Sequence, residues 1–293
     1  MSRPTVHHDH FIVSYPQEHV VQVTLNRPDK LNCINQATSR QIAQVWDDLD
    51  ADPTLWVGII TGRGRAFCTG ADLHEWNTLH TTSQTNPMTA PGLAGLPRRT
   101  GTKPILAAVN GLCLGGGFEM VANCDIVLAS SAAVFALPEV QRGIAPVAGC
   151  MPRLARTLGL QRTMELVLTG RKVDARTMGA WGLVSRVVDE GPDHNHHTGN
   201  GNEGGNGGNG EGERNAVVDA ALELARDICR NSPDALIVGR VGVRMAWEDG
   251  DVEAAVTKLE TEWYPRLVRG ANFGEGIRAF VEKRPPRWLD PKL

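Results

Sequence analysis

The sequence carries little net charge and has no long apolar run. Its 30 Lys and Arg residues nearly balance 33 Asp and Glu residues, so the overall charge gives no reason to expect nucleic acid or an anionic membrane as a partner. No apolar segment approaches the roughly 20 residues that a membrane-spanning helix needs. The polar start at residues 1–10 does not look like a secretory signal. We expect a soluble protein with no membrane partner.

Paired cysteines are also lacking. The six cysteines form no CxxC pair, and the nine histidines supply no metal-ligand spacing to accompany them. We therefore expect reduced thiols, an intracellular protein and no metal site. His194, His196 and His197 lie in a tract of Gly and Asn, where a solvated linker is the favoured interpretation, and we assign them no chemistry.

That tract, residues 191–214, has almost no apolar content and predicts a disordered insertion. It divides the chain into a core over residues 1–190 and a helical subdomain over 215–293. Amphipathic patterns predict the helices of this subdomain at 216–229, 233–247, 252–268 and 274–283.

Strand and helix patterns alternate in the core, which predicts the α/β class. Residues 11–15 and 19–25 are expected to pair as a hairpin, and residues 35–49 have the apolar spacing of a helix. Further strands are predicted at 56–61, 105–109, 126–129, 134–137 and 183–188. Residues 78–99 have little periodicity and predict a long mobile loop that would act as a lid.

Two glycine-rich joints each follow a strand, at residues 62–73 and 110–119, and they predict a close approach of backbone to a ligand. In the second joint, Gly115 and Gly116 precede a helix whose first amides lack intrahelical acceptors, and Glu119 follows within one turn. An amide and a carboxylate would then face one pocket. Alternatively, the glycines only permit close packing and Glu119 is an ordinary first-turn acid.

The first joint offers a second free amide at Ala71, followed by Asp72 and Leu73. Two such amides would form an oxyanion hole that stabilises an enolate. Asp72 has an alternative role as the N-cap of a short helix. Glu139 follows an apolar strand, where it is either a surface acid or the partner of Glu119. A pair of carboxylates at one pocket would hold a water molecule and move its proton.

These residues lie in blocks that resemble the crotonase (enoyl-CoA hydratase/isomerase) superfamily over about residues 11–283. The blocks include LNRPDKLNCI at 25–34, GRAFCTGADLHEW at 64–76, KPILAAVNGLCLGGGFEMVANCDIVLA at 103–129 and FALPEVQRGIAP at 135–146. The resemblance implies a spiral of ββα units. It also implies C-terminal helices that assemble a homotrimer, often paired into a hexamer.

The same resemblance implies roles for individual residues. Ala71 and Gly116 would supply the oxyanion amides, and Glu119 and Glu139 would be the catalytic acids. The acyl-CoA substrate would be bound by Lys30, Leu31, Asp72, Leu73 and Gly115, and by Phe280 and Lys283 reached from a neighbouring subunit. Coenzyme A would be part of the substrate, with no separate cofactor.

Both glutamates are present, which favours a hydratase or dehydratase over an isomerase or an acyl-CoA hydrolase on the same fold. A catalytically silent scaffold member is a third alternative. The segment PVAGCMPRL at 146–154 departs from the family's PGAGGTQRL, and we expect Val147 and Cys150 to line the acyl side and select an unusual acyl group. The motif FALPE resembles the corresponding segment of family members that dehydrate carnitinyl-CoA or mevalonyl-CoA. The pathway is either fatty acid metabolism or a specialised metabolite route.

The last three residues, Pro291, Lys292 and Leu293, resemble a peroxisomal import tripeptide. They predict a peroxisomal location and binding to the import receptor, with a cytoplasmic location as the alternative.

Overall fold

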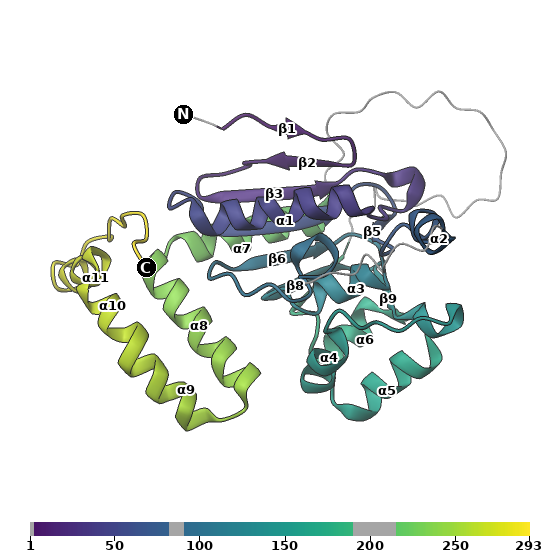
Figure 1. Ribbon diagram of the computed structural model, residues 1–293. Helices are drawn as coiled ribbons and strands as arrows, with labels where there is room; N and C mark the ends of the chain where they lie inside the picture. Colours follow the sequence, from purple (N-terminus) through teal and green to yellow (C-terminus); the bar gives the residue numbers. More distant parts are fainter. Residues whose placement is uncertain (1–2, 82–90, 190–214) are drawn as a thin grey trace.

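Two sheets form the centre of the computed structural model, which describes residues 3–81, 91–189 and 215–293 (Figure 1). The larger sheet has the strand order β1-β2-β3-β4-β6-β8-β11, and the smaller sheet has the order β10-β9-β7-β5. The strands are β1 (Val6–His7), β2 (Phe11–Ser14), β3 (Val20–Leu25), β4 (Val57–Gly62), β5 (Ala66–Cys68), β6 (Ile105–Val109), β7 (Leu112–Leu114), β8 (Ile126–Ser130), β9 (Val134–Ala136), β10 (Val173–Asp174) and β11 (Arg186–Val188).

Consecutive strands alternate between the two sheets, which makes the core a spiral. β4, β6 and β8 lie in the larger sheet, and each is followed by its partner β5, β7 or β9 in the smaller sheet. The strands that repeat from turn to turn pair in parallel within each sheet. The predicted α/β fold with a spiral of ββα units is confirmed. The predicted hairpin is the antiparallel pair β2-β3, with Phe11 opposite Leu25.

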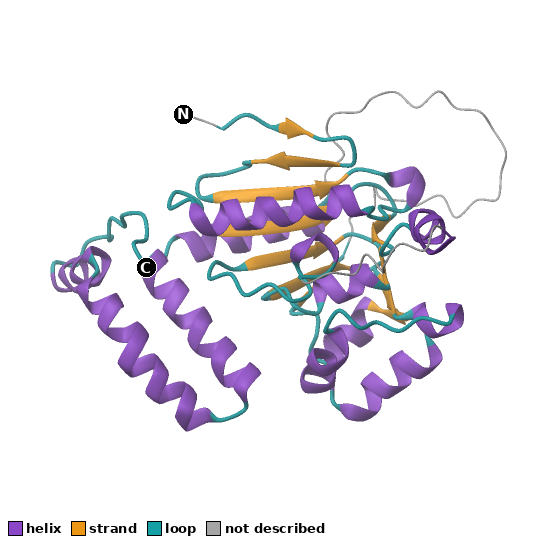
Figure 2. Ribbon diagram, viewed as in Figure 1, coloured by secondary structure: helices purple, strands orange, loops and turns teal. Residues whose placement is uncertain are grey.

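Helices cover both faces of the larger sheet (Figure 2). Helix α1 (Gln36–Ala51) buries Ile42, Trp46 and Leu49 in the main core cluster. On the other face, helix α7 (Ala216–Cys229) packs Val217, Ala221 and Ala225 against β-strand residues that include Val20, Val57, Ile59, Leu106 and Leu128. Successive strand residues point to opposite faces, so a sheet covered on both sides requires nearly continuous apolar strands. The strands at the centre of this sheet have such sequences.

The helices after α7 extend away from the sheets as an arm (Figure 1). They are α8 (Pro233–Asp249), α9 (Val252–Lys258), the π-helical turn η4 (Leu259–Trp263), α10 (Tyr264–Arg269) and α11 (Ala271–Val281). An ion pair of 2.9 Å between Arg240 and Asp125 holds α8 to the core. The division of the chain at residues 190 and 215 and the role of the arm in trimer assembly stay predictions. Within the described ranges, no helix has the length and apolar content to cross a membrane.

The expected long loop at residues 78–99 is ordered structure at both of its described ends. Helix α2 covers Leu73–Thr81, and the 3-10 turn η2 covers Leu93–Gly95. Ala94 is fully buried, and both of its backbone groups are satisfied: its N–H donates to Ser39 Oγ at 2.8 Å and its carbonyl accepts from Trp46 Nε1 at 3.1 Å. The loop expectation was wrong there because one turn is too short to show periodicity. Residues 82–90, with the predicted lid, and the insertion at 191–214 lie outside the described residues.

The other helical segments connect the strands of the core. They are η1 (Pro28–Lys30), α3 (Gly116–Val121), η3 (Pro138–Arg142), α4 (Cys150–Leu158), α5 (Leu160–Thr169) and α6 (Ala175–Ala180). The strand expected at 183–188 begins only at Arg186, because Leu183 and Val184 are buried in the turn that follows α6.

Candidate active site

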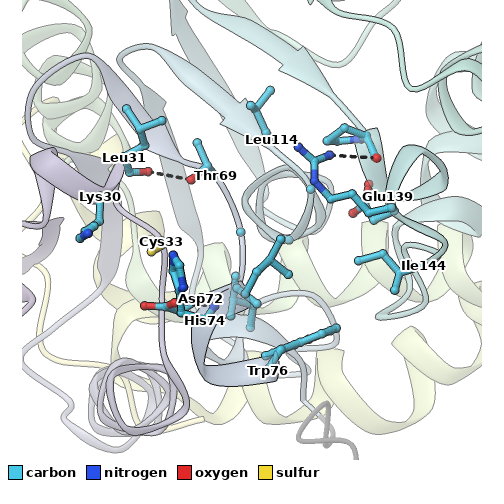
Figure 3. Close-up of a pocket in the computed structure, with 18 of the residues that line it drawn as sticks. Lys30, Leu31, Cys33, Thr69, Asp72, His74, Trp76, Leu114, Glu139 and Ile144 are labelled. Atoms are coloured by element: carbon cyan, nitrogen blue, oxygen red, sulfur yellow. Dashed lines mark hydrogen bonds between the residues drawn. The ribbon is translucent and has the colours of Figure 1, made fainter. Parts of the chain in front are cut away.

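A cavity of about 770 Å³ lies where the segments after β3, β5, β7 and β9 meet (Figure 3). It brings together most of the residues predicted from the sequence, namely Lys30, Leu31, Ala71, Asp72, Leu73, Gly115, Gly116, Glu119 and Glu139. In Figure 3, Lys30 and Leu31 lie at one end of the cavity and Glu139 at the other. These residues come from four separate segments, which the spiral places side by side.

The amide of Ala71 faces the cavity because of a single parallel bridge. Ile34 donates to the carbonyl of Gly70 at 2.9 Å, and its own carbonyl accepts from the amide of Asp72 at 3.0 Å. Adjacent amides of an extended chain point in opposite directions, so the N–H of Ala71 points away from Ile34. Ala71 lines the cavity, and its amide is available to an acceptor there.

Gly116 supplies the second amide at the start of helix α3. It is the first residue of the helix, so its N–H has no intrahelical acceptor. Gly70 lies against this amide, since a Cβ at Gly70 would come within 2.9 Å of Gly116 N. The conformations of Gly70 (φ 98°) and Gly115 (φ 56°) are those that glycine tolerates best. The two glycine joints therefore bring together the amides of Ala71 and Gly116, neither of which donates to another described residue.

Glu119 lies in the first turn of α3 and is buried. Its Oε1 accepts a hydrogen bond of 2.9 Å from the amide of Ala148. Burial raises the pKa of Glu119, while hydrogen bonds from Ala148 and the Cys150 thiol oppose that rise. These bonds hold the carboxylate in one orientation and favour its charged form.

The charged form of Glu139 is stabilised by fewer hydrogen bonds. It lies in η3, is 8% exposed, and its Oε2 has no hydrogen-bond partner among the described residues. Burial raises its pKa to about 7, and the nearby charge of Glu119 adds to the rise. The carboxyl of Glu139 therefore titrates near neutral pH, where it both holds and releases a proton.

This burial has a measurable cost in stability. The folded chain holds the Glu139 proton more tightly than the unfolded chain, so stability is lost as the pH rises from about 4.5 towards 7. Glu139→Gln removes this titration. We therefore expect the gain in free energy of unfolding, variant over wild type, to be about 2 to 3 kcal/mol larger at pH 8 than at pH 4. Urea unfolding at both pH values measures the difference.

The matched control is Glu18→Gln, because the side chain of Glu18 is 88% exposed. It should change stability by less than about 0.5 kcal/mol at either pH. An equal effect of Glu139→Gln at pH 4 and pH 8 would show that the carboxyl of Glu139 does not titrate abnormally.

Asp72 has the structural role that was weighed as its alternative. Its carboxylate accepts from the amide of His74 at 3.1 Å at the start of α2, and it forms an ion pair of 3.1 Å with Arg27. This pair ties the Arg27 segment to the oxyanion joint. Any contact of Asp72 with a substrate stays a prediction.

Several cavity residues were not anticipated. The cavity is also lined by Arg27, Cys33, Thr69, Trp76, Leu93, Arg142 and Ile144. Thr69 Oγ1 donates to the carbonyl of Leu31 at 3.1 Å and so fixes the loop beside Lys30 (Figure 3). Trp76 was within reach of sequence reasoning, because it follows Asp72 by four residues, about one helical turn.

Residues 146–154, where the sequence differs from the family's pattern, are not placed as we expected. Val147 is 64% exposed and does not line the cavity, whereas Ile144 and Ala145 do. Gly149 has a φ of 113°, and the turn there buries Ala148 and Cys150 next to Glu119. The expectation that Val147 shapes the acyl side was wrong. Cys150 contacts the carboxylate of Glu119 and does not line the cavity.

Three predicted regions lie elsewhere. Phe280 is 85% exposed on α11 and Lys283 follows that helix, and neither lines the cavity of its own chain. In the C-terminal tripeptide, Pro291 is buried and the amide of Lys292 donates to Asp234 Oδ1 at 3.1 Å. The roles predicted for these residues stay predictions.

Comparisons with known proteins agree with this geometry. Residues 16–198 match the family model "Enoyl-CoA hydratase/isomerase". The chain is 52% identical over 282 residues to the mevalonyl-coenzyme A hydratase of Aspergillus fumigatus, covering 96% of each chain. It is 41% identical over 289 residues to that of Beauveria bassiana, covering 96% of this chain and 95% of the relative.

A solved structure extends the agreement to the fold. The crystal structure of an enoyl-CoA hydratase from Mycobacterium tuberculosis superposes with a TM-score of 0.81 at 28% identity, covering 97% of this chain and all of that one. The match covers the core and the C-terminal arm together. The chain belongs to the enoyl-CoA hydratase/isomerase family.

Proposed function

We propose that this enzyme, a CoA-thioester hydratase or dehydratase, acts on an acyl group of the mevalonyl type. Such a group carries a hydroxyl and a methyl on carbon 3 and a second hydroxyl on carbon 5. The observation that carries the reaction is the pair of buried carboxylates, Glu119 and Glu139, facing one cavity with the free amides of Ala71 and Gly116. The acyl group is supported by the two relatives named as mevalonyl-coenzyme A hydratases.

In the proposed mechanism, the thioester oxygen binds between the amides of Ala71 and Gly116. During hydration, Glu119 takes a proton from water as the water oxygen bonds to carbon 3. The electron pair of the double bond moves towards the thioester and forms an enolate, whose oxygen the two amides stabilise. Glu139 then gives its proton to carbon 2. Exchange with solvent afterwards removes the proton from Glu119 and returns one to Glu139, which restores the starting state. Dehydration follows the same steps in reverse.

The ionisation behaviour of the two glutamates fits this division. A proton donor works best when its pKa lies near the working pH, and burial raises the pKa of Glu139 to about 7. The amide of Ala148 favours the charged form of Glu119, which a base requires. This difference supports the assignment of Glu139 to carbon 2 and Glu119 to water, which is the one that the family resemblance implies.

The test is a comparison of two enoyl-CoA thioesters. We expect 5-hydroxy-3-methylpent-2-enoyl-CoA to be hydrated with a kcat/KM at least tenfold above that of the straight-chain but-2-enoyl-CoA, as loss of conjugated-thioester absorbance. In ¹⁸O-labelled water, the label should appear on carbon 3 of the product. Double-bond migration without label, or release of free CoA thiol, would instead indicate an isomerase or a hydrolase. Preference for the straight chain would reject the proposed acyl group.

We also propose a homotrimer or a pair of trimers in which Phe280 and Lys283 of one subunit approach the CoA end of its neighbour's cavity. Both residues lie on the arm and outside their own cavity, and Phe280 is exposed. Light scattering on the full-length protein measures the assembly, and a monomer would rule it out.

A peroxisomal location is proposed from Pro291, Lys292 and Leu293. In the described conformation the amide of Lys292 is bonded to Asp234, so binding to an import receptor requires release of this tail. A fluorescent protein fused in front of the full chain should enter peroxisomes, and removal of the last three residues should leave it in the cytoplasm.

A further inference from the structure

Part of the cavity is not used by the proposed reaction. The amides and glutamates account for the thioester and for carbons 2 and 3. Beyond them, the wall is formed by Leu73, Trp76, Leu93, Ile144 and Ala145. Figure 3 shows Trp76 and Ile144 on the opposite side of the site from Lys30 and Leu31. An acyl chain that extends past carbon 3 therefore meets a mainly apolar wall that suits a methyl branch.

Trp76 is the exception to this apolar character, because its indole carries an N–H. Trp76 lies in α2, whose helical hydrogen bond from Trp76 N to the carbonyl of Asp72 is 3.2 Å long. This bond ties the backbone of Trp76 directly to Asp72, the residue that follows Ala71. Its side chain is half-buried and lines the cavity.

The indole N–H of Trp76 makes no hydrogen bond to any described residue. Trp181, Trp247 and Trp263 likewise show no indole hydrogen bond to a described residue, whereas the remaining three tryptophans do. Trp46 Nε1 donates to the carbonyl of Ala94 at 3.1 Å, Trp56 to that of Pro53 at 3.1 Å, and Trp288 to that of Arg230 at 2.7 Å. A buried indole usually finds a partner. Among the tryptophans without one, Trp76 is set apart because it lines this cavity, where a bound molecule can reach its side chain.

We infer that Trp76 determines substrate specificity by donating a hydrogen bond to an oxygen at the distal end of the acyl group. The inference rests on the proposed function and deepens it, because the mevalonyl type places a hydroxyl on carbon 5. Indole is a donor only, so it pairs with a hydroxyl oxygen and gives nothing to a chain that ends in a methyl group. The apolar wall holds the branch, and Trp76 recognises the distal oxygen.

The charges beside the cavity disfavour a positively charged distal group. Arg142 also lines the cavity, and its positive charge opposes a distal cation. Its Nη1 already donates to the carbonyl of Pro138 at 3.1 Å. The indole of Trp76 is a neutral donor, and a hydroxyl is its matching partner.

The experiment compares two thioesters that differ in one oxygen, 5-hydroxy-3-methylpent-2-enoyl-CoA and 3-methylpent-2-enoyl-CoA. Wild type and Trp76→Phe are assayed with both, since phenylalanine keeps an aromatic ring and loses the N–H. We expect the variant's kcat/KM to fall about tenfold on the hydroxylated thioester and less than threefold on the other, as one hydrogen bond implies. Activity on the second thioester also shows that the variant is folded.

Trp247→Phe is the matched control, because Trp247 lies on α8 and outside this cavity. It should leave the ratio of the two kcat/KM values at the wild-type level. Equal losses on both thioesters, or no loss on either, in Trp76→Phe would overturn the inference while leaving the hydratase function intact. Inactivity of the wild type on both thioesters would overturn the proposed acyl group and this inference with it.

Discussion

Glu139→Gln is expected to lower kcat for hydration by 10²- to 10⁴-fold, the usual contribution of a positioned general acid or base. Glutamine keeps the size and hydrogen-bonding shape of the side chain but cannot give a proton to carbon 2. KM should change little, because the thioester is held by the amides of Ala71 and Gly116. The rate is measured by the absorbance of the conjugated thioester, and thermal melting verifies that the variant is folded.

The dependence on pH supplies an independent readout of the same group. Hydration needs Glu139 protonated, so the wild-type rate should fall as the pH rises through about 7, the pKa to which burial raises this carboxyl. Dehydration needs Glu139 ionised, so its rate should rise over the same range. In Glu139→Gln, the residual activity should lose this titration.

Glu119→Gln should cause a loss of similar size, because the water would lose its base. The double variant should be little worse than either single variant, since residues that act in one step are not additive. Glu18→Gln, in an exposed position, serves as the control for a charge change alone. Full activity of Glu119→Gln and Glu139→Gln on every hydratable thioester would reject the mechanism.

The sequence predicted the fold class and most elements because apolar periodicity reports burial directly. The strand at β4 and the helix α1 were found within two residues of their ends, since each buries a regular set of side chains. Periodicity fails for single turns. The η2 turn, Leu93–Gly95, is held by Ser39 and Trp46, residues about 50 positions away, and nothing local indicates that contact.

In the candidate site, the two carboxylate side chains were predicted from the sequence, whereas the backbone amide that orients one of them was not. Glu119 and Glu139 were identifiable because carboxylates at the ends of apolar segments are conspicuous. The amide of Ala148, which orients Glu119, was missed because every residue but proline has such an amide and only the turn at Gly149 aims it. The error at Val147 has the same origin, since that turn points its side chain to solvent.

Gly70→Ala is expected to lower kcat/KM by 10²- to 10³-fold, the effect of losing one oxyanion donor. A Cβ at residue 70 would lie 2.9 Å from Gly116 N, in the space that an enolate oxygen needs. No flexible side chain can move to relieve this contact, because the neighbouring atom belongs to the backbone. The steady-state rates of hydration measure the loss.

The same substitution also places alanine at a φ of 98°, which costs stability by itself. Gly159→Ala separates the two effects, because Gly159 has a φ of 90°, a Cβ there would meet nothing within 4 Å, and it does not line the cavity. Both variants should be destabilised by about 1 to 2 kcal/mol in urea unfolding. Only Gly70→Ala should lose activity. If the two variants kept equal activity, the amide of Gly116 would not bind the thioester oxygen, and the enolate would have to be stabilised by the amide of Ala71 without it.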